Sequence, residues 1–272
     1  MNTKILFVFC LVLLGAGSSA RAQRDTTWQP LRTLRGDIVD FAVDNLDNIY
    51  LFSSTNQLKK INAQGDSLAV YNDVRNFGRA TYLDVSNPLR VLLYYKDFST
   101  IVVLDRLLNI RSVIDLRRAN IFQVQAIGLS HDNNIWLFDE LNSKLKKIDE
   151  SGNVVLETPD FRQLFGASPS PVSIVDQDGF VYMYDPAAGV YVFDYYGTLK
   201  NKILITGWTD FRVAGKYIYG LTGDTLHRYE IRTYRSDQEV LPPPVWPFLS
   251  LGFTSTRLYA MKKDLLEVYP LH

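Results

Sequence analysis

Residues 134–152 read NIWLFDELNSKLKKIDESG, and this stretch decides the fold. It contains two short runs of alternating character, 135–138 and 144–148, and a tight turn that leads to a third run at 154–156. Residues 48–66, NIYLFSSTNQLKKINAQGD, carry nearly the same text. Alternation by two predicts β-strands rather than helices. A hairpin sequence that occurs twice in one chain predicts a repeat architecture.

The unit recurs six times at intervals of about 40 residues, which is the spacing of propeller blades. Helical arrays would place apolar residues three and four positions apart, and that spacing is not seen here. The chain is therefore predicted to be an all-β, six-bladed β-propeller with four short strands in each blade. The large residue in the middle of each second strand marks the copies: Tyr50, Leu92, Trp136, Tyr182, Tyr219 and Tyr259.

The last unit lacks its outer strand. Because an open sheet edge invites mispairing, we expect an N-terminal strand over 28–34 to complete the last blade beside 266–269. The other expected strands are 38–43, 49–52, 58–61 and 68–71; 82–85, 91–95, 101–104 and 112–116; 126–129, 135–138, 145–148 and 154–156; 172–175, 181–184, 190–193 and 202–205; 211–213, 217–221, 226–231 and 239–241; and 249–253 and 258–261.

Three hairpin turns share one chemistry, in which an Asn or Asp opens the turn and a Gly follows three residues later. Gly adopts the positive φ that a bulged hairpin requires. In the second unit we expect Asn109 to take this left-handed position after Asp105. Asp139 and Asp185 occupy matching positions after two second strands, where Asp braces a loop through backbone amides. The turns are Asn62 to Gly65, Asp149 to Gly152 and Asp194 to Gly197.

The phrases DNLDNIYLF (44–52) and SHDNNIWLFDELNSKLKKIDESG (130–152) resemble the NHL-repeat family. That family's motif is a polar turn, Asn-Ile-Tyr-Val, an Asp and later an Arg-Ile-x-Lys-Phe type of strand. The fourth unit, DQDGFVYMYD (176–185), matches in part, and the second, fifth and sixth units depart from the motif. The resemblance implies a ring with a central channel and two loop-bearing faces. Members include RNA binders, protein scaffolds and a few metal-dependent lyases, so the fold does not choose the function.

The first 22 residues differ in character from the rest of the chain. Lys4, an apolar run over 5–14 and the small-x-small sequence that ends at Ala22 predict a secretory signal peptide, too short to span a membrane. Residues 23–272 are then a single propeller domain without a transmembrane segment. Cys10, the one cysteine, lies in this leader, so the mature chain would contain no disulfide. The protein is predicted to be exported and to be periplasmic, outer-membrane-associated or extracellular.

The charges are balanced, with 29 basic and 29 acidic residues in 272. Nucleic acids and anionic membranes select proteins with clustered Lys and Arg. Nucleic acids and anionic membranes are therefore not expected as partners. The expected partners are other proteins.

The sequence contains no convincing catalytic residue, so we predict that the protein is not an enzyme. Ser67 lies within the letters Gly-Asp-Ser-Leu of a known esterase motif. In those enzymes the serine follows a strand and opens a helix, whereas Ser67 is expected in a hairpin between two strands. Its match to the motif is explained by chance.

No metal or cofactor is predicted either. A zinc site requires three or four convergent ligands. The histidines His131, His227 and His272 fall at different positions of the repeat and need not converge. The acidic residues Asp37, Asp40, Asp44 and Asp47 do not have the spacing of a calcium loop, and Asp44 and Asp47 have simple duties in a β-turn.

A surplus of aromatic residues near loops is the remaining candidate for function. Aromatic side chains contribute large contact area at protein interfaces with little loss of entropy. The alternative for each of them is packing between blades. The candidate partner-binding residues are Tyr95, Phe161, Phe165, Tyr195, Tyr196, Trp208, Trp246 and Phe248.

These observations predict a non-catalytic scaffold that binds other cell-envelope or secreted proteins. An exported propeller without an attached domain looks like the propeller accessory subunits of cell-envelope assemblies, such as those of type IX secretion. One alternative is a small-molecule or glycan binder with a site at one mouth of the channel. Another is a metal-dependent lyase or hydrolase.

Overall fold

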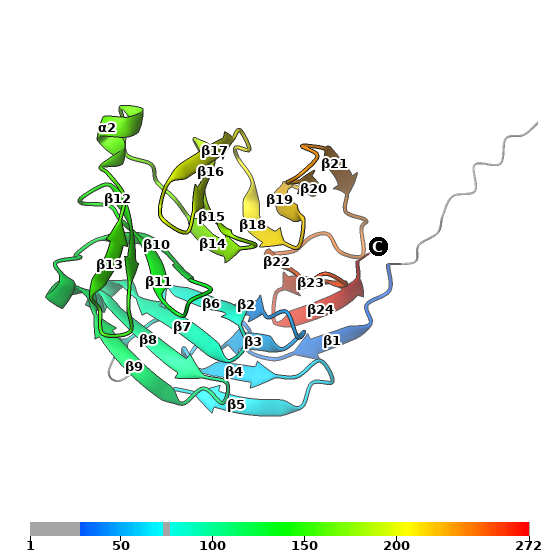
Figure 1. Cartoon of the computed structure of the whole chain (residues 1–272). Coiled ribbons are helices and arrows are strands. Elements are labelled where there is room, and N and C mark those ends of the chain that lie inside the picture. The colour runs from blue at the N-terminus through cyan, green and yellow to red at the C-terminus, as the bar shows by residue number, and fades with distance from the viewer. Residues whose placement is uncertain (1–27, 73–76, 272) are drawn as a thin grey trace, which may run out of the picture.

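The structure is a computed structural model that describes residues 28–72 and 77–271, and they form six four-stranded antiparallel sheets in a ring (Figure 1). The predicted six-bladed β-propeller is confirmed. The innermost strands of neighbouring blades pack against one another around the central channel. The predicted signal peptide, residues 1–22, lies outside the described residues.

Blades one to five are meanders of four consecutive strands, blade six combines three consecutive strands with β1, and the predicted strands are found within a few residues of their expected ends. Blade one is β2 (Asp40–Val43), β3 (Ile49–Phe52), β4 (Leu58–Ile61) and β5 (Ser67–Tyr71); blade two is β6 (Tyr82–Asn87), β7 (Arg90–Tyr95), β8 (Thr100–Asp105) and β9 (Ile110–Asp115); blade three is β10 (Val124–Leu129), β11 (Ile135–Asp139), β12 (Lys144–Ile148) and β13 (Val154–Glu157). Blade four is β14 (Ser173–Gln177), β15 (Phe180–Asp185), β16 (Gly189–Asp194) and β17 (Leu199–Ile203); blade five is β18 (Thr209–Ala214), β19 (Tyr217–Thr222), β20 (Thr225–Glu230) and β21 (Ser236–Val240); blade six is β22 (Ser250–Phe253), β23 (Arg257–Lys262), β24 (Leu265–Pro270) and β1 (Arg32–Arg35).

The ring is closed by β1, which pairs antiparallel with β24, as predicted (Figure 1). The strand begins at Arg32 rather than at residue 28. Pro30 precedes it, and proline has no N–H to give to a ladder. Leu31 N donates the first hydrogen bond to Val268 O at 2.7 Å. Trp28 lies outside the strand with its ring 6.1 Å from that of Tyr269.

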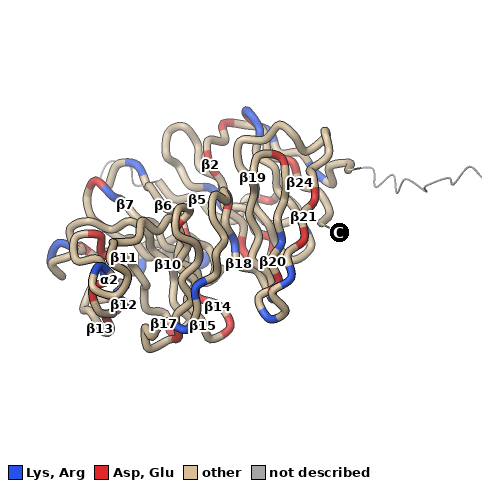
Figure 2. Tube along the Cα trace, turned by 90° about the horizontal axis from the view of Figure 1, so that it is seen from above, with Lys and Arg blue, Asp and Glu red and all other residues tan. Residues whose placement is uncertain are grey.

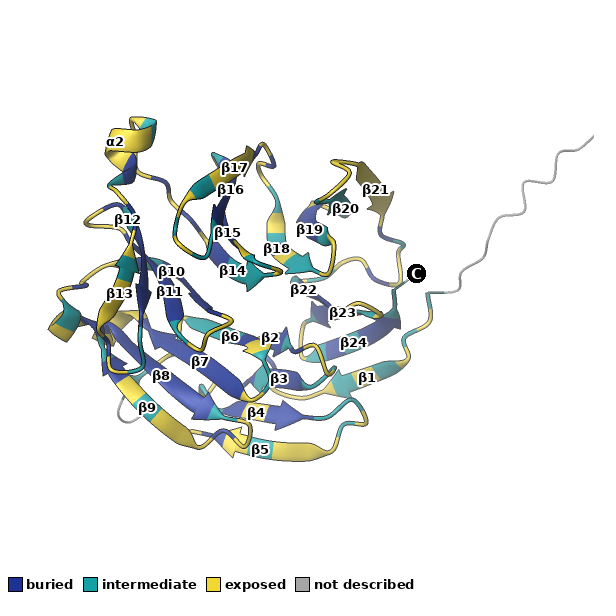
Figure 3. Cartoon of the chain, in the orientation of Figure 1, coloured by how far each residue is buried: buried dark blue, intermediate teal, exposed yellow. Residues whose placement is uncertain are grey.

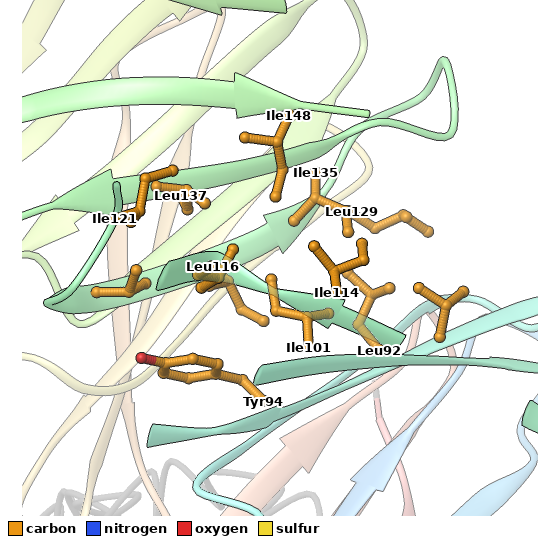
Figure 4. Packing of buried hydrophobic residues seen from close by; sticks show 13 residues of the cluster. Leu92, Tyr94, Ile101, Ile114, Leu116, Ile121, Leu129, Ile135, Leu137 and Ile148 are labelled. Carbon is orange, nitrogen blue, oxygen red and sulfur yellow. The ribbon is translucent and has the colours of Figure 1, made fainter. Parts of the chain in front are cut away.

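Six apolar clusters hold the ring together, and each one joins two neighbouring blades. Figure 4 shows the cluster between blades two and three, where Leu92, Ile101 and Ile114 face Leu129, Ile135 and Leu137. The second and third strands are therefore largely buried, except that β20 of blade five is mostly half-buried, while the outer strands are largely exposed (Figure 3). The large residues that mark the repeat are all buried: Tyr50, Leu92, Trp136, Tyr182, Tyr219 and Tyr259.

Two of these marker residues also form hydrogen bonds across a blade boundary. Trp136 Nε1 of blade three donates to Asp176 Oδ2 of blade four at 3.1 Å. Tyr259 OH of blade six donates to Asp47 Oδ1 of blade one at 2.9 Å. A buried phenol or indole needs such a partner, because an unmade hydrogen bond in the interior is costly. The hydrogen bonds therefore fix the orientation of adjacent blades relative to each other.

The predicted hairpin turns are confirmed in their Asx chemistry. The side chains of Asn62, Asp105, Asp149 and Asp194 each accept hydrogen bonds from the backbone N–H groups two and four residues later. The expectation for Asn109 is wrong, because Leu108 takes the left-handed position with φ 62°. Leu108 lies three residues after Asp105, where the other turns have Gly. Asn109 instead donates from Nδ2 to the Asp105 carboxylate.

The predicted loop bracing is also found: Asp139 Oδ1 accepts from Asn142 N at 3.2 Å, and Asp185 Oδ1 accepts from Ala187 N at 2.8 Å. The described helices are short and lie in connections: η1 (Lys96–Phe98), η2 (Leu116–Ala119) and α2 (Phe161–Phe165). None of the helices in the described part of the chain has the length and apolar character needed to cross a membrane.

Asp47→Ala should weaken the closure between blades six and one. The carboxylate accepts hydrogen bonds from Thr254 Oγ1 and Tyr259 OH, both at 2.9 Å, and lies 3.5 Å from Arg257 Nε. Leaving these donors unpaired should lower the free energy of unfolding by about 2–3 kcal/mol in a denaturant titration.

Asp178→Ala is the matched control. Asp47 and Asp178 both follow a first strand and both have positive φ, 61° and 52°. Asp178 is exposed and accepts only a 3.3 Å hydrogen bond from the neighbouring Gln177. Equal losses for the two variants would attribute the effect to backbone strain and not to the contact between blades.

Candidate functional site

The connections of the ring fall on two faces because the strands of a meander alternate in direction. We call one the loop face: it carries the connections from each outer strand to the next innermost strand, and the turns between second and third strands. We call the other the turn face: it carries the turns between first and second strands and between third and fourth strands. Lys, Arg, Asp and Glu are interspersed over the trace (Figure 2).

Two of the predicted partner-binding residues, Tyr95 and Phe161, are buried, so their assignment to a binding surface is wrong. Tyr95 ends β7 and packs in the cluster between blades one and two. Phe161 begins α2 and stacks with its ring centroid 6.0 Å from Phe138 and 5.6 Å from Phe193. Phe161 thus anchors the helix between blades three and four rather than presenting it to a partner.

The other predicted aromatic residues do not form one surface. Tyr195 and Tyr196 lie in a turn of the turn face, and Tyr196 is the more exposed of the two. Tyr195 stacks on His131 at 3.7 Å and its OH accepts from Gly179 N at 2.8 Å. The remaining four lie on the loop face, where Trp246 is exposed and Phe165, Trp208 and Phe248 are partly buried.

The loop face carries a set of exposed apolar side chains that the sequence reasoning missed. Phe98, Phe122, Leu141 and Leu164 are between 42 and 53% exposed. They come from four successive connections: η1, the segment after η2, the turn between β11 and β12, and α2. We call these four residues the apolar arc. Exposed apolar side chains that gather on one face of a folded protein commonly mark an interaction site.

Hydrogen bonds between the connections hold the apolar arc together. Ser99 Oγ donates to Phe122 O at 3.4 Å, which joins η1 to the next connection. Glu140 N donates to Gln123 O at 2.9 Å, and Phe161 N donates to Ser143 O at 2.8 Å. The backbone that carries the apolar arc is therefore continuous over blades two to four, and it presents a preformed surface.

The turn face has a pocket of about 500 Å³ at the channel mouth. It reaches inward as far as Tyr82 and Arg212 and is bordered by Asp84 and Asp176. Both acids are engaged by the protein: Asp84 Oδ2 accepts from Leu129 N at 2.7 Å, and Asp176 Oδ2 accepts from Trp136. Arg212 forms no ion pair with any described residue. The pocket has the size of a small-ligand site.

The other end of the channel holds two carboxyl groups on blades one and five. Burial raises the pKa of Asp40 and of Asp210 above their ordinary value of 3.8, and Arg212 opposes the rise. The charge of Asp40 raises the pKa of Asp210 further. Asp210 Oδ1 also accepts a hydrogen bond from Ser250 Oγ at 3.2 Å.

The histidines do not converge. His131 lies on the turn face with Nδ1 3.3 Å from Asp176 Oδ2, and His227 lies in β20 with its ring stacked 5.0 Å from Trp208. His272 lies outside the described residues. Within residues 28–72 and 77–271, no group of three or more His, Cys, Asp and Glu side chains is arranged to hold a metal ion.

No protein-family model matches the chain, and no curated protein matches it. Solved structures do match, and those named below match with low sequence identity. A catalytically inactive virginiamycin B lyase from Staphylococcus aureus with quinupristin is 13% identical, with a TM-score of 0.60 over 88% of this chain and 87% of that one.

Two further matches come from other kinds of protein. The Pan2 WD40 domain of Neurospora crassa is 10% identical, with a TM-score of 0.61 over 89% of this chain and 95% of that one. BBS1N in complex with ARL6DN is 11% identical, with a TM-score of 0.58 over 90% of this chain and 97% of that one. At these identities the matches show the propeller fold alone.

Asp210→Asn should stabilise the protein at neutral pH. Because the pKa of Asp210 is raised in the folded state, the unfolded chain loses this proton first as the pH rises. The protonated carboxyl therefore carries no penalty below 3.8, and stability is lost as the pH rises through the folded pKa. Asparagine cannot ionise and still accepts from Ser250. The gain in the free energy of unfolding should be present at neutral pH and vanish in acid.

Asp224→Asn, in an exposed turn of the same blade, is the control and should leave the free energy of unfolding unchanged both at neutral pH and in acid. Arg212→Gln should act in the opposite direction from Asp210→Asn, since it removes the positive charge that favours the ionised carboxyls. A gain for Asp210→Asn that is constant from acid to neutral pH would contradict the assignment.

Proposed function

We propose that the protein is a non-catalytic scaffold that binds other proteins through the apolar arc on its loop face. The observation that carries the proposal is the exposure of Phe98, Phe122, Leu141 and Leu164 on four successive connections that are joined by hydrogen bonds. Partly exposed aromatic and leucine side chains on a rigid backbone bind with little loss of conformational freedom. The anchor Phe161 is buried on both sides of its ring, so α2 holds Leu164 in a fixed position.

Two structural neighbours support a role in protein binding. BBS1N was solved in complex with ARL6DN, and the Pan2 domain is a WD40 propeller. The virginiamycin B lyase is an enzyme on a similar fold, which is why fold alone does not decide between the two roles. We also propose that the chain is related to NHL-repeat propellers, on the basis of the hairpin sequences at 48–66 and 134–152.

The proposal includes an exported location and a place in a cell-envelope assembly of the type IX secretion kind. Its support is the leader-like sequence over residues 1–22 and the propeller architecture. The partners would then be other envelope or secreted proteins. A rigid propeller without a disulfide is compatible with this setting because its stability comes from packing between blades.

Crosslinking in the native host tests the scaffold. The double variant Phe122→Asp with Leu164→Asp places charge on the apolar arc, so the proteins crosslinked to it should fall about tenfold or more in yield. Leu46→Asp with Leu89→Asp, at two exposed positions of the turn face, is the matched control and should leave the yield unchanged. Quantitative mass spectrometry of the crosslinked species provides the measurement.

Equal crosslinking by both double variants would contradict docking on the apolar arc.

The pocket at the channel mouth supports a second candidate, a small-molecule or glycan binder, because Tyr82 lies beside carboxylates and Arg212 there. That reading would replace the scaffold if a sugar or peptide raised the melting temperature of the wild type and Arg212→Gln abolished the increase.

Cleavage of the predicted leader after Ala22 tests whether the protein is exported. The mature protein recovered from the cell envelope should begin at Gln23, by N-terminal sequencing or intact mass. Ala20→Glu together with Ala22→Glu should block processing, because signal peptidase requires small residues at these two positions of the small-x-small sequence. An unprocessed wild-type protein in the cytoplasm would contradict export without affecting the test of the apolar arc.

A further inference from the structure

The outer strands of the six blades fall into two chemical groups. In blades one to three their exposed side chains are largely apolar, and in blades four to six they are largely charged or polar. The apolar group is Leu68 and Val70 on β5, Ile110 and Val113 on β9, and Val154 and Val155 on β13, all between 40 and 52% exposed. The polar group includes Lys200 and Lys202 on β17, Asp237 and Glu239 on β21, and Arg35 on β1. Figure 3 shows β5 and β9 as exposed strands along the rim.

This contrast matters because the outer strand of a blade has one edge without a neighbouring strand. Such an edge is a template for another strand, and soluble proteins protect it with charged side chains. Charged or polar side chains predominate on the outer strands of blades four to six, whereas β5, β9 and β13 expose mainly apolar side chains, with Arg111 on β9 and Glu157 on β13 as the exposed charged residues. A mainly apolar edge with β-branched residues is suited to receive a strand from another protein, as in β-strand addition.

Among the three apolar outer strands, β9 has the longest regular edge. It is the last strand of its sheet, and its pairing with β8 is regular from Ser112 to Asp115, opposite Val103 to Thr100. The bulge in this hairpin falls before Ser112, near the turn. In β5 and β13 the bulge leaves a shorter regular run. A partner strand therefore finds its best register beside β9.

The charge around β9 defines the chemistry of the partner. Arg111 is exposed within the strand, and Arg106 is exposed in the preceding turn. Neither forms an ion pair with a described residue, whereas Asp115 is engaged by Arg117, with Nε 3.0 Å from Oδ1. The edge thus combines half-exposed Ile110 and Val113 with unpaired positive charge.

We propose that the free edge of β9 binds an extended acidic segment of a partner protein, in which β-branched residues alternate with Asp or Glu. Main-chain hydrogen bonds to β9 supply the affinity. Contacts with Val113 and the charge of Arg111 select the segment. This rim site is separate from the apolar arc and goes beyond the scaffold function proposed above.

A fluorescent peptide of about eight residues with alternating valine and glutamate, the length of an ordinary strand, is the probe for anisotropy titrations. Val113→Lys should weaken its binding about tenfold or more. Val240→Lys, the same substitution on the exposed outer strand β21, should leave binding unchanged. Arg111→Glu should weaken it as well, and Arg35→Glu on β1 should not. These side chains are partly or fully exposed, so the variants should fold, which circular dichroism checks.

A peptide with proline in place of the central valine should fail to bind, because proline cannot complete the ladder. A valine–lysine peptide should also fail, because Arg111 repels it. The proposal is overturned if the valine–glutamate peptide does not bind, if the proline peptide binds equally, or if Val113→Lys and Val240→Lys behave alike. A dimer in sedimentation that Val113→Lys dissociates would assign the edge to a second copy of the chain instead. The Phe122→Asp, Leu164→Asp variant should bind the peptide normally, which separates this site from the scaffold function.

Discussion

The structure depends on one constraint: a single four-stranded sheet has two apolar faces and buries neither by itself. Each of the six clusters draws its residues from two neighbouring blades, so every blade is stable only in the presence of both neighbours. Burying a side chain such as Leu92 or Ile101 contributes about 1.5–3 kcal/mol. The ring is the arrangement that covers all twelve faces, and its outer rim and two surfaces are left for function.

Polar contacts add orientation to this packing. In the two copies of the hairpin, the lysine opposite the marker residue lies over its ring: Lys60 Nζ is 5.0 Å from the centroid of Tyr50, and Lys147 Nζ is 4.6 Å from that of Trp136. The preceding lysine of β12, Lys146, is buried and its Nζ lies 2.7 Å from Asp139 Oδ2. A buried charge is tolerated only when it is paired and hydrogen-bonded. In the repeated letters LKKI, Lys60, Lys146 and Lys147 therefore make inner contacts of a blade, and only Lys59 is exposed to solvent.

The strands and the closure of the ring can be predicted from the sequence, because the alternation of apolar and polar residues and the missing outer strand of the last unit are visible along the chain. The sequence is not sufficient to predict the site. The prediction that Tyr95 and Phe161 face a partner fails because residue type indicates contact area but not the direction of a side chain. Leu141 gives no signal in the sequence because a single apolar residue in a polar turn forms no pattern. The bonds of Asp176 to blade three join residues 40 to 46 positions apart, a distance at which no local rule applies.

Pairing of β1 with β24 joins the two ends of the chain, and this has a kinetic consequence. Contacts between residues far apart in sequence form slowly, because the loop-closure entropy is lost before the contact is gained. During synthesis, blade six cannot be completed until β24 has left the ribosome. Until then the facing sides of blades six and one are uncovered, and β1 has no strand to pair with. The nascent chain is thus exposed to aggregation at one seam, and a chaperone that recognises apolar strands would act there.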